Sequence, residues 1–136
     1  MEVASPDGVA FAVALATLVV LDAGWFTVVR RFGLYPSDVF VEVRLAYGVG
    51  AWVALALALS CLRRRQPWQP TAWGAAVGGI TFAVFNSSEL AIRPTWTRRA
   101  ALLDTLWGVT ACTLASVVGH VVSCYQIKSP PDVRQP

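Results

Sequence analysis

Four long apolar segments, separated by short loops that contain arginine, constrain this chain more than any other feature. The segments cover about 9–29, 45–62, 71–92 and 100–125. At ~1.5 Å per residue their helices would be roughly 27–39 Å long, enough to cross a bilayer with some tilt. The loops between them are too short for an external domain. We therefore predict an all-α fold in one membrane domain, residues 1–136, built as a bundle of four transmembrane helices.

Composition and charge agree with this prediction. The chain is 56% hydrophobic and 14% charged, with a mean hydropathy of +0.56, whereas a soluble domain carries about 25% charged residues. Of its 11 basic residues, ten are arginines, and nine of these lie singly or in small groups between the apolar segments. Nucleic-acid binding requires basic residues gathered on one surface. We therefore expect the lipid bilayer, and not nucleic acid, to be the partner of this chain.

Turn and capping residues set the expected helix ends. Ser37 follows Pro36 and can cap the second helix, which is expected to begin between Ser37 and Leu45. Thr71 is expected to cap the third helix, and Pro94 to end it.

The first segment and the loop charges bear on topology. Residues before the first segment include Glu2 and Asp7 but no basic residue, whereas a cleavable signal has a positive first region. We therefore expect this segment to be a helix of the mature protein.

Four spans place both termini on the same side of the membrane. Basic residues are too evenly divided between the two sides to orient the bundle, although the acidic start followed by Arg30 and Arg31 favours non-cytosolic termini.

Three carboxylates lie inside the apolar segments: Asp22 in the first, Glu89 in the third and Asp104 in the fourth. A charged group inside a span is costly and marks a functional candidate. The chain directions place all three in the same half of the bilayer, and Asn86 lies one turn from Glu89 on the same helix face. We therefore predict an intramembrane polar site.

Two of these carboxylates occur in the same short pattern. Asp22 is followed by Trp25 and Asp104 by Trp107, each three residues later on one helix face. Each indole N–H is thus expected to satisfy the carboxylate of its own helix. We therefore add Trp25 and Trp107 to the predicted site, with Asp22 and Asp104 facing the bundle interior.

Other residues have structural interpretations. Gly74, Gly78 and Gly79 form a stripe of small residues typical of close helix packing. Trp68, Trp73 and Trp96 fit an interfacial aromatic belt.

The segments Leu21–Trp25, Phe82–Ala91 and Leu103–Gly108, together with Trp96, resemble an uncharacterised four-helix integral membrane family of bacteria and large DNA viruses. That family has D-x-x-W in its first helix, Y-x-x-Y-D-x-x-N-x-A in its third and D-x-x-W-G in its fourth. In this chain Phe82 and Phe85 stand at the tyrosine positions, Asn86 at the aspartate and Glu89 at the asparagine. The resemblance implies a fold and a motif but no activity.

Two functions remain open at this point. The first is a structural or accessory membrane bundle that packs with partners, with copies of itself or in a larger membrane complex, its carboxylates acting as interhelical hydrogen-bond acceptors. The second is a minimal proton-coupled or cation-handling carrier in which the carboxylates titrate. A carrier needs a carboxylate that water can reach, whereas a structural carboxylate is closed off by its partners.

Catalysis and metal binding have little support in the sequence. His120 is the only histidine and has no ligand partner at metal-binding spacing. The chain contains no nucleophile-elbow, zinc-protease or phosphate-loop motif. We expect a protein that is not an enzyme and has no metal or cofactor.

The cysteines leave two alternatives. Cys61 and Cys124 lie at the same membrane edge and could form a disulfide, or all three cysteines could be free thiols.

Overall fold

The computed structural model describes residues 7–40, 45–61 and 68–128. Within these ranges the chain is helical and contains no strand. The elements are α1 (Gly8–Arg31), the short 3-10 helix η1 (Ser37–Phe40), α2 (Leu45–Ser60), α3 (Gln69–Ile92) and α4 (Arg98–Lys128). The prediction of an all-α fold with four main helices is confirmed for the described residues.

Three of the four helices are long and apolar enough to cross a membrane: α1, α3 and α4. The second is shorter than predicted. It has 16 residues and ends at Ser60, so at ~1.5 Å per residue it is about 24 Å long. The expected early start at Ser37 is not realised as part of α2, because Ser37–Phe40 form the separate η1.

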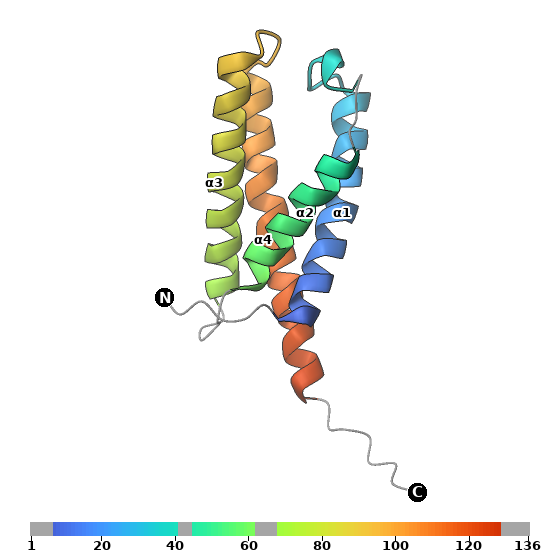
Figure 1. Ribbon diagram of the computed structural model, residues 1–136, viewed down its shortest axis with the longest axis vertical. Helices are drawn as coiled ribbons and strands as arrows, with labels where there is room; N and C mark the ends of the chain where they lie inside the picture. Colours follow the sequence, from blue (N-terminus) through green and yellow to red (C-terminus); the bar gives the residue numbers. More distant parts are fainter. Residues whose placement is uncertain (1–6, 41–44, 62–67, 129–136) are drawn as a thin grey trace, which may run out of the picture.

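Consecutive helices run in opposite directions, and α4 lies at the centre of the bundle (Figure 1). Its main neighbours are α3 and α1, while α2 packs chiefly on α1 and crosses obliquely toward the beginning of α3. Small side chains allow this close approach. The largest buried cluster consists of Ala14, Leu18, Ala56, Leu59, Ala111, Cys112 and Ala115.

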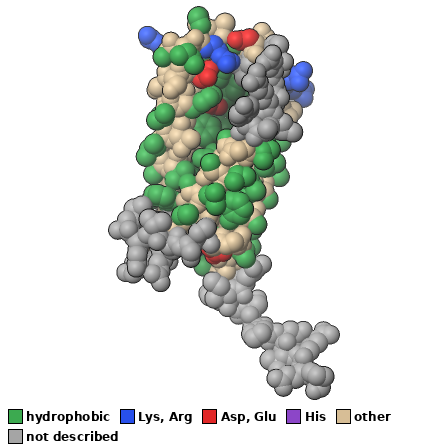
Figure 2. All heavy atoms as spheres, viewed as in Figure 1, with side chains coloured by type: hydrophobic (Ala, Val, Ile, Leu, Met, Phe, Trp, Pro, Cys, Tyr) green, Lys and Arg blue, Asp and Glu red, His purple; other side chains and the backbone are tan. Residues whose placement is uncertain are grey.

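Large apolar side chains also cover the outside of the bundle. Val20, Ile80 and Ile92 are 70%, 68% and 76% exposed, and hydrophobic atoms extend along the flank seen in Figure 2, with Lys and Arg side chains at one end. A helix that is apolar on its outer and inner faces needs lipid or protein around it. This surface agrees with the three candidate spans.

The ends of α1 have clear local causes. The Asp7 carboxylate caps its first turn by accepting hydrogen bonds from Val9 N at 3.0 Å and Ala10 N at 3.2 Å. At the other end, Gly33 adopts a φ of +59° and the Leu34 N–H donates to the Val29 carbonyl at 3.0 Å. This is a Schellman C-cap. The residue at the position of Gly33 must adopt a left-handed backbone conformation, which glycine does without steric cost. It turns the chain toward Tyr35.

The start of α3 differs from the prediction. Thr71 does not cap it, because the helix already begins at Gln69 and includes Pro70 in its first turn. Proline fits there because its missing N–H would have no partner within the helix. The other end is as predicted: α3 ends at Ile92, two residues before Pro94.

The glycines of α3 bring its backbone against α4. A Cβ added to Gly74 would lie 2.5 Å from the Cys112 carbonyl oxygen and 2.6 Å from the Thr113 Cα, and one added to Gly78 would collide with the Gly108 carbonyl. Gly79 differs, since its nearest neighbour would be the side chain of Val109 at 3.5 Å. The close contact therefore depends on Gly74 and Gly78.

No disulfide crosslinks the described helices. Cys61, Cys112 and Cys124 are all free, so the disulfide considered for Cys61 and Cys124 is not formed.

Candidate functional site

Asp104 is the most enclosed of the three carboxylates. It is 8% exposed and lies on α4 in the half of the bundle nearer the loop between α1 and η1. The Tyr35 hydroxyl donates to its Oδ1, and Asn86 Nδ2 donates to its Oδ2 at 2.9 Å. Both carboxylate oxygens therefore have a donor, one from the loop and one from α3.

Asn86 is fixed by its own partners. Its Nδ2 also lies 2.9 Å from the Phe82 carbonyl and 3.2 Å from Thr105 Oγ1, while its Oδ1 accepts a hydrogen bond from Trp96 Nε1 at 3.0 Å. Because an indole N–H only donates, this bond determines which amide atom faces Asp104. Trp96 is 6% exposed, so its expected place in an interfacial belt is wrong.

Asp22, on α1, has a different pair of partners. Trp52 Nε1 of α2 donates to its Oδ2 at 2.7 Å, and Trp107 Nε1 of α4 donates to its Oδ1 at 2.8 Å. Two donor-only groups therefore hold the two oxygens, and Asp22 links three helices.

In neither D-x-x-W pattern does the tryptophan donate to the aspartate of its own helix, so the expected local pairing is wrong. Trp107 of the α4 pattern binds Asp22 of the α1 pattern. Trp25 donates to the Tyr35 hydroxyl at 2.8 Å, and Tyr35 in turn donates to Asp104. The antiparallel packing of α1 and α4 stacks the Trp25 and Trp107 rings at a centroid distance of 4.8 Å. In this arrangement the Trp107 N–H reaches Asp22 on α1, whereas the Trp25 N–H reaches Tyr35 in the loop after α1.

These contacts form two hydrogen-bonded groups, which the stacked Trp25 and Trp107 rings join into one network with members on all four α-helices. Its members are Asp22, Trp25, Tyr35, Trp52, Asn86, Trp96, Asp104 and Trp107. The sequence identified the carboxylates, Asn86 and two tryptophans, but not Tyr35, Trp52 or Trp96. Tyr35 was visible only as the residue before Pro36, and nothing in the sequence places it against α4.

Tyr35 lies outside the helices yet is buried, at 7% exposure. Burial and the hydrogen bond to Asp104 raise the pKa of its hydroxyl above the ordinary value for tyrosine. The hydroxyl therefore remains a neutral donor over the physiological pH range, and it can hold Asp104 and accept from Trp25 at the same time.

Glu89 does not bond to this network. Its side chain forms an ion pair with Arg93, one turn later on α3, with 2.9 Å between Oε2 and Nε. Both residues nevertheless line the same cavity as Asp22 and Asp104. Glu89 thus contributes to the wall of the site, and its charge is compensated locally.

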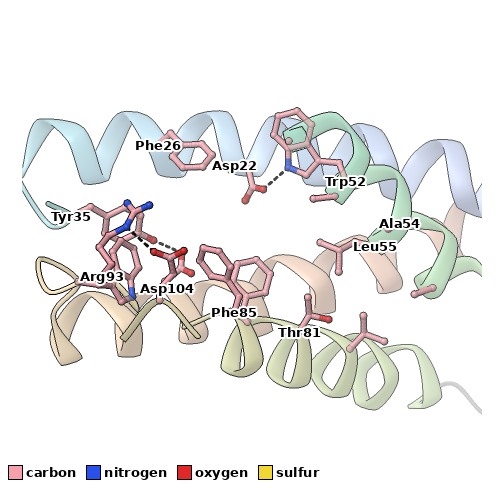
Figure 3. A pocket seen from close by; sticks show the side chains of 17 residues that line it. Asp22, Phe26, Tyr35, Trp52, Ala54, Leu55, Thr81, Phe85, Arg93 and Asp104 are labelled. Atoms are coloured by element: carbon pink, nitrogen blue, oxygen red, sulfur yellow. Dashed lines mark hydrogen bonds and ion pairs between the residues drawn. The ribbon is translucent and has the colours of Figure 1, made fainter. Parts of the chain in front are cut away.

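The cavity has a volume of about 800 Å³ and lies between α1 and α2 on one side and α3 on the other. Figure 3 shows Tyr35, Arg93 and Asp104 toward one end, and Ala54, Leu55 and Thr81 toward the other. Among the described residues no group of three or more His, Cys, Asp or Glu side chains is placed to hold a metal ion. The arrangement offers hydrogen-bond acceptors and aromatic faces beside a large space.

No protein-family model, curated protein or solved structure matches this chain.

Proposed function

We propose that this chain is a small integral membrane protein whose four helices all cross the bilayer, with both termini on the non-cytosolic side. The length and apolar surface of α1, α3 and α4 support three of these spans. For the short α2, support comes from the alternating direction of the helices and from its apolar sequence. A span of about 24 Å is accommodated by local thinning of the bilayer.

Its proposed role is structural or accessory: a bundle that presents a fixed apolar surface to partners or to copies of itself. The observation that carries this proposal is that each carboxylate oxygen of Asp22 and Asp104 has a hydrogen-bond donor. Asp22 and Asp104 each accept two hydrogen bonds, from groups on other helices or on the α1–η1 loop. Hydrogen bonds between membrane helices contribute about 0.6–2 kcal/mol each. Membership of the uncharacterised four-helix family that the motifs resemble is part of the same proposal.

The four-span topology predicts that the two ends of α2 lie on opposite sides of the membrane. In a variant with all three native cysteines replaced by alanine, S37C and W68C would report these sides, since Ser37 and Trp68 are both exposed. A membrane-impermeant maleimide should label one position in intact cells and the other only after permeabilisation. Equal labelling of both positions in intact cells would contradict a spanning α2.

A proton-coupled or cation-handling carrier is the second candidate, favoured by one observation. The cavity reaches Asp22 and Asp104 despite their hydrogen-bond partners. A titrating carboxylate beside a large space is what alternating access would use.

Proton flux separates the two functions. Purified protein would be placed in liposomes with a pH gradient and an internal pH-sensitive dye. The structural role predicts that wild type and D104N lose the gradient no faster than empty liposomes. A faster loss with wild type that returns to the empty-liposome rate in D104N would establish the carrier instead.

A further inference from the structure

The cavity lies beside the oblique helix α2. This helix begins beside α1 and approaches α3 only toward its end (Figure 1), and the residues of α3 that line the cavity run from Val77 to Glu89. The described lining residues come from all four helices and the loops at one end of the bundle. The space of about 800 Å³ can hold a drug-sized molecule.

The two ends of this space differ in chemistry. Tyr35 and Asp104 lie toward one end, Asp22 lies between the two ends near Trp52, and the apolar side chains of Ala54 and Leu55 lie toward the other end (Figure 3). An occupant that matches both ends must carry a polar head on an apolar body.

Charge determines the sign of that head. Among the described lining residues there are three carboxylates and one guanidinium. Glu89 and Arg93 compensate each other in their ion pair. The side chains that donate hydrogen bonds to Asp22 and Asp104 within the described part of the chain are neutral. A carboxylate in a low-dielectric surrounding whose donors are neutral favours a cation beside it, because the cation stabilises the ionised form of the carboxylate.

The aromatic lining narrows the type of cation. The side chains of Phe26, Trp52, Phe85 and Trp96 contribute to the wall, and aromatic rings attract organic cations that are weakly hydrated. A metal ion would need several oxygen ligands at one point, and the described residues contain no such group. We propose that this cavity is a binding site for a monovalent organic cation with an apolar body, such as a lipophilic amine or phosphonium.

This site rests on neither the structural nor the carrier role, since a ligand can bind a bundle that moves no protons. The test compares two ions of the same shape and opposite charge, tetraphenylphosphonium and tetraphenylborate. Binding of each is measured on the purified full-length protein in phosphatidylcholine nanodiscs, with empty nanodiscs subtracted. Wild type should bind the phosphonium saturably and the borate at least about tenfold more weakly.

Three variants complete the experiment. D104N should weaken phosphonium binding by about tenfold or more and narrow the preference over borate, because it removes one negative charge from the wall. A54W should reduce binding of the phosphonium by occupying the apolar end without changing any charge. D38N is the matched control: Asp38 lies in η1, bonds Thr95 and does not line the cavity, so binding should be unchanged.

Equal binding of the two ions by wild type would overturn the proposal. So would a D104N variant, or an A54W variant, that binds the phosphonium as wild type does. A pure folding defect in D104N would weaken both ions alike, and the change in preference separates that case from loss of charge.

Discussion

Replacing Asp22 by asparagine should destabilise the protein by about 1–3 kcal/mol, clearly more than the same change at Asp104. Both partners of Asp22 are indole N–H groups, which only donate. An asparagine offers one acceptor oxygen and one NH₂ group, so its NH₂ would face a donor whichever way the amide turns. One indole N–H is then left without an acceptor in an apolar surrounding, which costs its full desolvation.

Asp104 tolerates asparagine better because Tyr35 is one of its two partners. The amide oxygen can accept from Asn86, and the amide nitrogen can donate to the Tyr35 oxygen. The Tyr35 hydroxyl proton then loses its acceptor but, unlike an indole N–H, it can rotate toward the cavity that Tyr35 lines. We expect a loss of about 1 kcal/mol or less for D104N. Thermal unfolding of both variants in the same detergent, followed by circular dichroism, measures the difference. Equal losses, or a larger loss for D104N, would show that Asp22 is not held by two donors.

This contrast shows what the sequence can predict at such a site. Asp22 and Asp104 stand out because a carboxylate in an apolar segment has few explanations, and the chain direction is enough to place both in the same half of the bundle. Their partners do not follow from the same reasoning. A spacing of three residues puts Trp25 beside Asp22 on one helix face, but the indole stacks on Trp107 of the antiparallel helix and donates to Tyr35.

Tyr35 and Trp96 were missed for a related reason. They lie in or next to loops, where position in the sequence says little about depth, and both are buried by the packing of Val29 and Ala100 around them. Trp96 was therefore interpreted as an interfacial residue. Helix type and number depend on local pattern and length, whereas the network depends on which helices meet and at what distance. That distance is set largely by glycine.

Alanine substitutions at the adjacent positions Gly78 and Gly79 of α3 should have different effects on the stability of the protein. G78A should destabilise the protein by about 1–3 kcal/mol. The added Cβ meets the Gly108 carbonyl and its carbon, which belong to the α4 backbone and cannot turn away as a side chain can. G79A should be neutral or stabilise by up to about 1 kcal/mol, because its Cβ makes only ordinary contact with Val109 and alanine favours the helix.

The expected damage in G78A extends to the site. Asn86 lies on α3 two turns beyond Gly78 and donates to Asp104 on α4, so helices forced apart at Gly78 lengthen this bond. Combining each alanine change with D104N tests the connection by thermal unfolding. The losses for G78A and D104N should be less than additive, because a bond already weakened cannot be lost again. With G79A the two effects should simply add. If G78A and G79A unfold at the same temperature, α3 and α4 are not in the close contact on which this network depends.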